Sequence, residues 1–270
     1  MDEVLRALGA RDAQSVSGGC IHRCYRVRIG ARERFLKINE ARFADAFAAE
    51  ADGLQALRGV GLRAPEPIAH GVAGGGAYLL LELLALERGG DFAALGRMLA
   101  EAHRNPGPRF GWRRDNYIGS TAQQNGWSED WPAFFWQRRL RPQLALAAAK
   151  GFRFEVDGVV EVLRAHRPPA ALLHGDLWSG NVGFTAQGPV VFDPAVYYGD
   201  READLAMTEL FGGFPSEFYA AYREAYPLHP GYAQRKHLYN LYHLLNHLNL
   251  FGAGYAGQVR ATLGLLRDAL

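Results

Sequence analysis

The spacing of apolar residues changes along the chain, from strand-like segments near the N-terminus to helical patterns in the remainder. Residues 25–29 and 34–38 indicate two strands joined by a tight turn at Gly30-Ala31, a typical hairpin connection. The apolar run 77–86 is interrupted only by Glu82 and predicts a buried strand that leaves this first region. A small sheet is therefore expected at the N-terminus.

The segment from Arg42 to Leu57 carries the spacing of one helical face. Its face residues recur at offsets of four, three, four and three, and they are Phe43, Phe47, Glu50, Leu54 and Leu57. A carboxylate among apolar neighbours is costly unless it is paired, so Glu50 needs a cationic partner. Lys37 on the preceding strand is the nearest candidate in the sequence.

Helix-breaking prolines and a predicted hinge divide the chain into two unequal lobes. Pro65 and Pro67 mark the end of the helical region, and residues 82–90 are assigned to a hinge. Asp91 can cap a helix that runs to about His103, and the long loop 105–126 is expected to be functional. We predict an α+β fold with a nucleotide-binding lobe at 1–83 and a mainly helical catalytic and substrate-binding lobe at 84–270.

Composition narrows the kind of partner. The 270 residues are 49% hydrophobic, enough for a sizeable core, and 30 Lys and Arg nearly balance 28 Asp and Glu. The net charge of +2 gives no reason to expect a nucleic-acid or membrane-surface ligand. We therefore expect a small-molecule partner and a monomer or homodimer.

The location of the protein is inferred from signals that the sequence lacks. The first residues have neither the basic region nor the apolar region of a secretory signal, and no segment is long enough to span a bilayer. Cys20 and Cys24 lie too close together to link distant parts of the fold. A reducing cytoplasm is the expected compartment.

The segment His174-Gly-Asp-Leu-Trp-Ser-Gly-Asn181 has the spacing of a kinase catalytic loop. In that pattern the Asp, here Asp176, accepts the proton of the attacking hydroxyl, and the Asn, here Asn181, holds magnesium. A short loop of this kind can hold the nucleophile and the phosphoryl group in line. Leu172 and Leu173 supply a buried anchor before it.

A second segment, 188–193, combines a turn, a short apolar strand and the carboxylate of Asp193. Kinases present their second metal-binding Asp in this way. Pro194-Ala195 follows instead of the Phe-Gly of protein kinases, and no Ala-Pro-Glu segment occurs downstream. Regulation of the protein-kinase type is therefore not expected.

Either segment alone is more typical of an Asx turn or cap than of catalysis. Both together, preceded by Lys37 and Glu50 in the right chain order, favour phosphoryl transfer with ATP and magnesium. Lys37 would contact the α- and β-phosphates while Glu50 holds it in place. The remaining residues assigned to nucleotide binding are Gly18, Gly19 and Cys20 in a weak phosphate-loop signal, and Glu82 and Leu84 at the hinge.

Three histidines and one cysteine could take part in chemistry, but a structural role is favoured for each of them. Because Asp176 already fills the position of the base, His174 is expected to be a packed residue that orients the loop. His243 and His247 have a four-residue spacing that could bind a metal, but no acidic motif accompanies them, and a polar stripe on a packed helix is favoured. A redox role for Cys20 ranks below that of an ordinary buried thiol.

Longer motifs give a more specific resemblance. The chain resembles the fructosamine kinase (ketosamine 3-kinase) family, which has a protein-kinase-like fold related to aminoglycoside phosphotransferases. The matching stretches are 115–119, 131–144, 174–181, 193–207, 210–214 and 238–252. The resemblance covers most of the chain and is loosest in the N-terminal lobe.

The resemblance implies phosphorylation of the 3-hydroxyl of a ketosamine, of the fructosamine or ribulosamine type, in the deglycation of amines or proteins. It implies that Asp176 is the base and that Asn181 and Asp193 are metal ligands. Position 200 is Asp where the family pattern has His, so the contacts of Arg201 and Glu202 are not carried over.

Three residues are tentative substrate contacts. Trp178 could form a wall for the sugar or its amine, or could equally be a core residue. Asp115 and Asn116 could contact substrate, although an Asx turn that fixes the loop is favoured. Arg201, Glu202 and Asp204 are expected to brace the catalytic loop rather than to contact substrate.

Two other functions remain open at this point. An aminoglycoside or choline-like alcohol could be the acceptor, because the phosphate-binding residues are common to such kinases. A catalytically silent nucleotide-binding protein is the alternative of another class. Retention of all five residues, Lys37, Glu50, Asp176, Asn181 and Asp193, argues against it.

Overall fold

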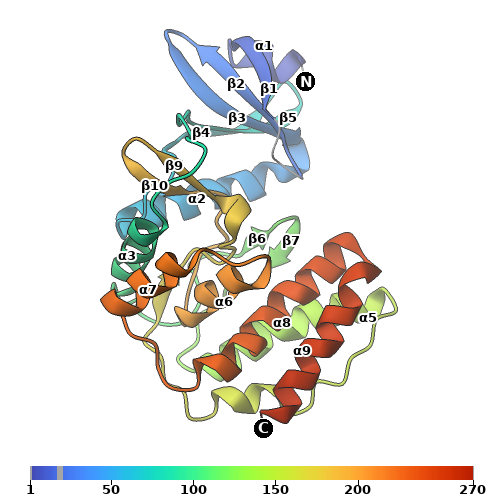
Figure 1. The fold of residues 1–270 in the computed structure, drawn as a ribbon. Helices are drawn as coiled ribbons and strands as arrows, with labels where there is room; N and C mark the ends of the chain where they lie inside the picture. Colours follow the sequence, from blue (N-terminus) through green and yellow to red (C-terminus); the bar gives the residue numbers. More distant parts are fainter. Residues whose placement is uncertain (1, 17–20, 270) are drawn as a thin grey trace.

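An antiparallel sheet lies at one end of the molecule and a mainly helical region at the other (Figure 1). The computed structural model describes residues 2–16 and 21–269. The large core cluster extends from the helical region to the near face of the sheet, and a smaller cluster lies on the far face. The predicted two-lobed α+β fold is confirmed, whereas the lobe boundary at 83/84 stays a prediction.

The N-terminal sheet has five antiparallel strands in the order β1-β2-β3-β5-β4. Their bounds are β1 Arg11–Val16, β2 Arg23–Ile29, β3 Arg32–Glu40, β4 Pro67–Ala73 and β5 Gly76–Glu82, after a short helix α1 Asp2–Ala7. The hairpin of β2 and β3 and the buried strand β5 confirm the prediction. The edge strands β1 and β4 were not predicted: every residue of β1 is exposed, and β4 begins at a proline.

The two faces of β3 have different partners. Leu36 and Ile38 are buried in the small cluster with Val4 and Tyr25. Since successive side chains in a strand point to opposite faces, Lys37 points to the other face, toward α2. A lysine is thereby placed under the sheet.

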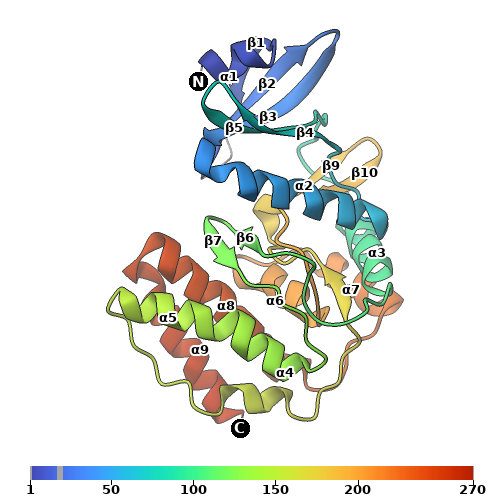
Figure 2. The same cartoon turned by 180° about the vertical axis from the view of Figure 1, so that it is seen from behind.

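Helix α2 Ala44–Gly59 runs beneath that face of the sheet, preceded by the 3-10 turn η1 Ala41–Phe43 (Figure 2). Phe47, Leu54 and Leu57 are fully buried, which confirms the predicted helical face. Glu50 lies on the same face, one turn after Phe47.

The connection between the lobes runs from Glu82, the last residue of β5, to helix α3 Phe92–His103. The side chain of Asp91 accepts a hydrogen bond from the Ala94 amide at 2.8 Å, as predicted for its N-cap. Helix α3 packs tightly against α7 Ser216–Ala225, since a Cβ at Gly96 would collide with the backbone of Phe218.

The long loop after α3 is more regular than expected. It contains a short hairpin, β6 Asn116–Ile118 and β7 Thr121–Gln123, that turns at Gly119 with a φ of +59°. A left-handed residue closes so tight a turn, and glycine adopts that backbone without strain. The remainder of the loop is irregular, as predicted.

Two short two-stranded sheets carry the motif segments. Strand β8 Ala171–Leu173 pairs with β11 Tyr197–Gly199, and β9 Val182–Thr185 pairs with β10 Gly188–Val191. A 3-10 turn, η4 Ser179–Asn181, joins the first motif to β9. The pairing of β8 with β11 brings the start of one motif beside the end of the other.

Helices make up the rest of the C-terminal lobe. They are α4 Trp131–Phe134, the π-helical turn η2 Phe135–Leu140, α5 Arg141–Ala149, η3 Val159–Leu163, α6 Glu202–Leu210, α7, α8 Tyr232–Phe251, η5 Ala253–Tyr255 and α9 Ala256–Asp268. The long α8 packs against α5, α6 and α9. Within the described residues, no helix has the length and apolar character needed to cross a membrane.

The π-helical turn η2 presents Arg139 to the loop that precedes α4. Its guanidinium is fully buried, lies 3.8 Å from the Tyr197 ring centroid and donates to the Gln124 carbonyl and the Asn125 side chain, both at 2.6 Å. A single buried cation therefore ties this helix to the loop and to β11.

Candidate active site

The backbone after β8 is held by Asp204 of helix α6. The amides of His174 and Gly175 donate to its two carboxylate oxygens at 2.7 and 2.8 Å. Gly175 has a φ of +82°, and a Cβ there would collide with the Ala195 carbonyl. The predicted bracing role of Asp204 is confirmed.

His174 is fully buried and bonded rather than free to act as a base. Its Nε2 lies 2.8 Å from the Phe192 carbonyl, and its Nδ1 lies 3.3 Å from the Asp176 amide. Burial lowers the pKa of its imidazole. The predicted loop-orienting role is confirmed.

Asp176 and Asn181 face each other across the short loop. The Asn181 amide nitrogen donates to the Asp176 carbonyl at 2.8 Å and lies 3.5 Å from the Asp176 carboxylate. Burial raises the pKa of Asp176 to about 7, and the charges of Asp193 and Asp204 act in the same direction. A carboxyl with a pKa near neutrality is suited to proton transfer at physiological pH.

Asp193 is brought to the same place by backbone hydrogen bonds on both sides of it. The Phe192 amide donates to the Asn181 carbonyl at 2.9 Å, and the Ala195 amide donates to the His174 carbonyl at 2.8 Å. Its φ of +51° is uncommon for a residue other than glycine. This backbone leaves its side chain 51% exposed.

Lys37 joins the two lobes at this point. Its ammonium is 2.7 Å from Glu50, which confirms the predicted ion pair, and it also donates to Asp193. Burial opposes the charged form of Lys37, but the two carboxylates raise its pKa, so the ammonium stays charged. The Lys37 contact holds the pKa of Asp193 below its usual range, although partial desolvation of its half-exposed carboxylate acts in the opposite direction.

The side-chain oxygens of Asn181 and Asp193 are suitable ligands for a magnesium ion. Because Asn181 uses its amide nitrogen toward Asp176, its carbonyl oxygen is available as an acceptor. Asp193 follows Phe192, whose amide donates to the Asn181 carbonyl, and it offers a half-exposed carboxylate. Magnesium prefers such oxygen ligands and keeps several waters, so two protein ligands are sufficient.

The other residues assigned to nucleotide binding are less informative. Gly18, Gly19 and Cys20 lie outside the described residues. Their assignment to phosphate binding, and the redox role considered for Cys20, therefore stay untested. The Glu82 carboxylate accepts from the Glu66 amide at 3.2 Å, which joins β5 to the residue before β4. Leu84 follows β5 and is partly buried.

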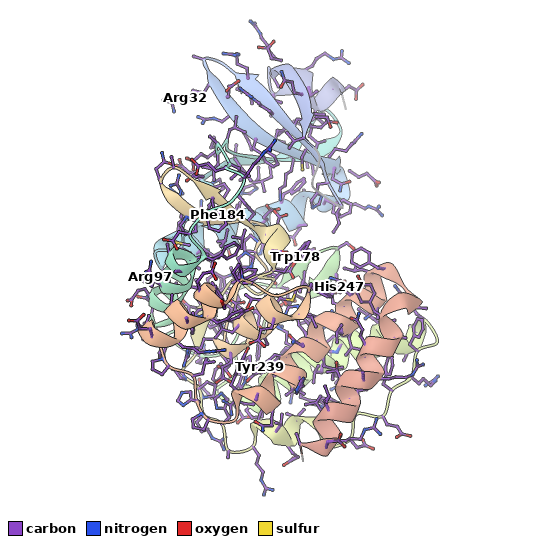
Figure 3. All side chains as sticks on the ribbon, in the orientation of Figure 1. Arg32, Arg97, Trp178, Phe184, Tyr239 and His247 are labelled. Atoms are coloured by element: carbon purple, nitrogen blue, oxygen red, sulfur yellow. The ribbon has the colours of Figure 1, made fainter. Side chains whose placement is uncertain are left out.

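Trp178 is not a core residue. Its side chain is 37% exposed and lies over Gly180, where a Cβ would strike the indole ring. Figure 3 shows Trp178 where the helical lobe meets the sheet lobe. The core-packing alternative is therefore wrong, and part of the indole ring is accessible two residues after Asp176.

Asp115 and Asn116 are engaged in fixing their loop. Asp115 accepts from the Asn125 amide at 2.8 Å, while Asn116 donates to the Val196 carbonyl at 2.7 Å. The Asn116 oxygen also accepts from Gln123 and Asn125. The loop-fixing interpretation is confirmed, and the tentative substrate role has no support from these contacts.

The residues after β11 form a buried ionic network. Glu202 forms a two-pronged pair with Arg235 at 2.7 and 2.8 Å, and Asp200 is 2.7 Å from His166. His166, Asp200 and Glu202 are close enough to hold a metal, but the Arg235 guanidinium already neutralises Glu202. Arg201 donates to Tyr222 and to the Tyr226 and Pro227 carbonyls.

The α8 histidines are packing residues, as expected. His243 is buried, and burial lowers its pKa to about 3. His247 packs against Phe211 at a ring-centroid distance of 4.5 Å and contacts the His243 carbonyl through Nδ1 at 2.9 Å. No acidic ligand joins them among the residues that the structure describes.

Sequence reasoning missed His22 and Asn39, which lie next to Lys37. The Asn39 side chain contacts the ring of His22 at 2.9 Å, and that ring packs on Phe47 of α2. Their only sequence signal is position: His22 follows the glycine-containing segment, and Asn39 is two residues after Lys37 on β3.

Comparison with known proteins points to one family of phosphotransferases. The family model described as fructosamine kinase matches residues 2–268. The chain is 48% identical over 263 residues to a probable ketoamine kinase of Synechocystis sp., covering 94% of this chain and 89% of that protein. It is 43% identical over 258 residues to a probable ketoamine kinase of Vibrio parahaemolyticus, covering 92% and 90%.

Solved structures agree with the fold. A candidate fructosamine-3-kinase from Haemophilus somnus superposes with a TM-score of 0.89 at 30% identity, covering 97% of this chain and 95% of that chain. A thermostable mutant of aminoglycoside phosphotransferase APH(4)-Ia in complex with ADP and hygromycin B gives a TM-score of 0.61 at 16% identity, with 98% and 95% coverage. The second likeness concerns the fold alone.

Proposed function

Since the chain belongs to the fructosamine kinase family and is a phosphotransferase, we propose that it transfers the γ-phosphoryl group of ATP to a ketosamine. The acceptor is the 3-hydroxyl of a fructosamine or ribulosamine. The observation that carries this proposal is the meeting of Asp176, Asn181 and Asp193 with the Lys37–Glu50 pair at one place. Ketoamine is the acceptor class in the names of the related proteins.

Asp176 is the proposed base. It accepts the proton of the attacking hydroxyl, and the hold of Asp204 on the preceding backbone keeps its carboxylate at a fixed position. A pKa of about 7 makes Asp176 a better proton acceptor than an ordinary carboxylate while leaving much of it ionised at neutral pH. Positioning of the hydroxyl for in-line attack is the second part of its role.

Lys37 is the proposed ligand of the α- and β-phosphates, and Glu50 keeps its ammonium in place. Asn181 and Asp193 would hold magnesium, which supplies neutralisation of the phosphate charge when bound. Because Lys37 contacts Asp193 directly, its ammonium lies next to the proposed metal ligand. With nucleotide bound, Lys37 would keep its bond to Glu50 and contact the phosphates in place of Asp193.

The remaining nucleotide contacts are assigned to the lobe 1–83 and to the hinge. Gly18, Gly19 and Cys20 would approach the phosphates, as the Gly-rich loop of protein kinases does. Glu82 and Leu84 would contact the nucleobase of ATP. The lobe 84–270 then carries the acceptor. Trp178 provides it with an aromatic face, which suits both the apolar side of a sugar and an amine cation.

The biological role proposed is deglycation. Phosphorylation at the 3-hydroxyl makes the adduct unstable, so that the sugar is shed and the amine is recovered. The partly exposed Trp178 suits an acceptor that extends beyond the site, either a free adduct or a glycated side chain of a protein.

The test is phosphorylation of an acceptor panel. Purified protein is incubated with ATP, magnesium and either fructosamine, ribulosamine, an aminoglycoside or choline, and the product is located by mass spectrometry and NMR. We expect a 3-phosphate on the ketosamines. An aminoglycoside or choline product without a ketosamine product would overturn the acceptor, and no transfer to any acceptor would favour a silent nucleotide-binding protein.

A further inference from the structure

His22 occupies a fixed position beside the proposed phosphate site. Its ring packs on Phe47 at a centroid distance of 4.7 Å and meets the edge of Phe43 at 5.6 Å. Phe47 precedes Glu50 by three residues and so shares its helical face. On β3, Asn39 follows Lys37 by two residues on the same face, about 7 Å along the strand. The His22–Asn39 contact therefore runs alongside the Lys37–Glu50 pair.

The orientation of the Asn39 amide is determined by its other contacts. Its oxygen accepts from the Glu40 backbone amide at 2.8 Å, and its nitrogen donates to the Ile21 carbonyl at 3.2 Å. Reversing the amide would break both bonds and place two carbonyl oxygens together. The atom that faces His22 Nδ1, at 2.9 Å, is therefore the nitrogen, which is a donor.

This orientation selects one tautomer of His22. Because Nδ1 must accept the Asn39 hydrogen bond, it carries a lone pair, and the proton of the neutral ring is on Nε2. A second proton on Nδ1 would point at the Asn39 amide hydrogen. Burial lowers the pKa of His22 to about 4, and the nearby Lys37 charge acts in the same direction, so the ring is neutral near pH 7.

The Nε2–H group is left as a donor. Among the described residues it has no hydrogen-bond partner, although Asn39 and the two phenylalanines hold the ring. A neutral donor suits a phosphate site that already contains Lys37 and a metal, because it adds a hydrogen bond without repelling either cation.

Resting on the proposed function, we propose that His22 is a further phosphate-binding residue, which donates from Nε2 to the polyphosphate of the nucleotide. Asn39 is its positioning residue, since it sets the tautomer. The pair extends the phosphate contacts one step along β3 from Lys37.

The tautomer can be observed without any ligand. Two-bond ¹H–¹⁵N correlation spectra distinguish a protonated from an unprotonated ring nitrogen, and His22 is assigned by the loss of its signals in His22→Phe. We expect Nε2 protonated and Nδ1 unprotonated at pH 7. A proton on Nδ1 would overturn the proposal whether or not the protein is a kinase.

Binding measurements test the contact itself. The affinities of AMP-PNP with magnesium and of adenosine, which lacks phosphates, are measured by calorimetry. His22→Phe keeps the ring packing but removes the donor, so AMP-PNP should bind about tenfold more weakly. Adenosine affinity should not change, and His22→Gln, which restores a donor near the position of Nε2, should recover most of the loss.

The matched control is His70→Phe, at an exposed histidine of β4, which should change neither affinity. An equal loss for both ligands in His22→Phe would mean a structural role and overturn the proposal, as would no loss for either. If the unaltered protein fails to bind AMP-PNP, the proposed function fails, while the tautomer still decides the geometry inferred for His22.

A double-mutant cycle tests the role of Asn39. Asn39→Leu frees the tautomer and should weaken AMP-PNP binding by less than His22→Phe does. In the His22→Phe background the same change should have no further effect, because its influence acts through the ring. Additive losses would overturn the positioning role.

Discussion

The ammonium of Lys37 donates to the carboxylate of Asp193, a residue 156 positions further along the chain. One partner is on the central part of the sheet, and the other follows the last strand of the β9–β10 hairpin. Together with the 2.7 Å bond to Glu50, this contact joins the lobes where phosphate chemistry is proposed.

Lys37→Met should lower both stability and activity. It leaves Glu50 buried without a cation, so we expect a loss of about 3–5 kcal/mol in the free energy of unfolding, measured by urea denaturation. In the double variant Lys37→Met with Glu50→Gln the stability should largely return, whereas phosphoryl transfer should not. Recovery of transfer in the double variant would contradict the role assigned to Lys37.

Asp176→Asn should leave nucleotide binding intact and reduce turnover about 100- to 10,000-fold, the range of general-base contributions. Turnover with ATP and a ketosamine and calorimetric affinity for AMP-PNP are the two measurements. Asp157→Asn, at an exposed aspartate, serves as the control. Nearly unchanged turnover in Asp176→Asn would remove Asp176 from the mechanism.

Asp204→Asn should destabilise the protein in a pH-dependent way. Burial favours the neutral form of Asp204, but the His103 hydrogen bond and the His174 and Gly175 amides outweigh it, and the pKa of its carboxyl is lowered. Its stabilisation is therefore fully present above about pH 4, the ordinary Asp pKa, and is lost as pH falls through the lower folded-state pKa.

Unfolding free energies of both proteins between pH 3 and pH 7 check this prediction. We expect Asp204→Asn to be about 2 kcal/mol less stable at pH 7, since charge-assisted hydrogen bonds are lost, and the difference to shrink at the acid end. A difference that is constant over the whole range would show that ionisation of Asp204 is not its source.

Glu202→Gln should lower the free energy of unfolding much more than a Glu→Gln change at the surface does. The Glu202–Arg235 pair is buried and two-pronged, so removal of the Glu202 charge leaves a buried guanidinium without a counter-charge. We expect a loss of about 3–5 kcal/mol in the free energy of unfolding. Glu33→Gln breaks an equally well-aligned but exposed pair with Arg26, and less than about 1 kcal/mol is expected. Thermal or urea unfolding compares them, and equal losses would refute the argument from burial.

Trp178→Ala should raise the KM for ketosamine by a few-fold up to about 30-fold while nucleotide affinity and stability change little, if its face contributes about 0.5–2 kcal/mol. Trp127, which is 36% exposed, compared with 37% for Trp178, provides the control Trp127→Ala. An unchanged KM for Trp178→Ala, or an equal effect of the two variants, would exclude the proposed wall.

Elements with strong periodicity or clear caps could be predicted from the sequence. The helical face of α2, the Asp91 cap and the β2–β3 hairpin each depend on neighbouring residues, so local patterns were sufficient. The Lys37–Glu50 pair could also be predicted, because a carboxylate on an apolar face requires a partner.

Features that depend on distant contacts could not be predicted. The exposed strand β1 has no apolar pattern. It forms because its backbone pairs with that of β2. The exposure of Trp178 depends on how the η4 turn folds under its ring. The His22–Asn39 contact joins Asn39 of β3 to the residue just before β2, and leaves no mark in the periodicity of either strand.

The π-helical turn η2 makes the length of its helix as important as its composition. A π turn contains one residue more than an α turn, so deletion of one residue there would restore a regular helix. The wider turn absorbs the extra residue, so the deletion would leave the flanking helices in register and shift the side chains within the turn itself, that of Arg139 among them. Arg139 could then no longer reach both Gln124 and Asn125, whose segment anchors Asp115 and Asn116. Length variants of this helix are thus a way to loosen the loop that holds Asp115 and Asn116 without altering any residue proposed to bind phosphate.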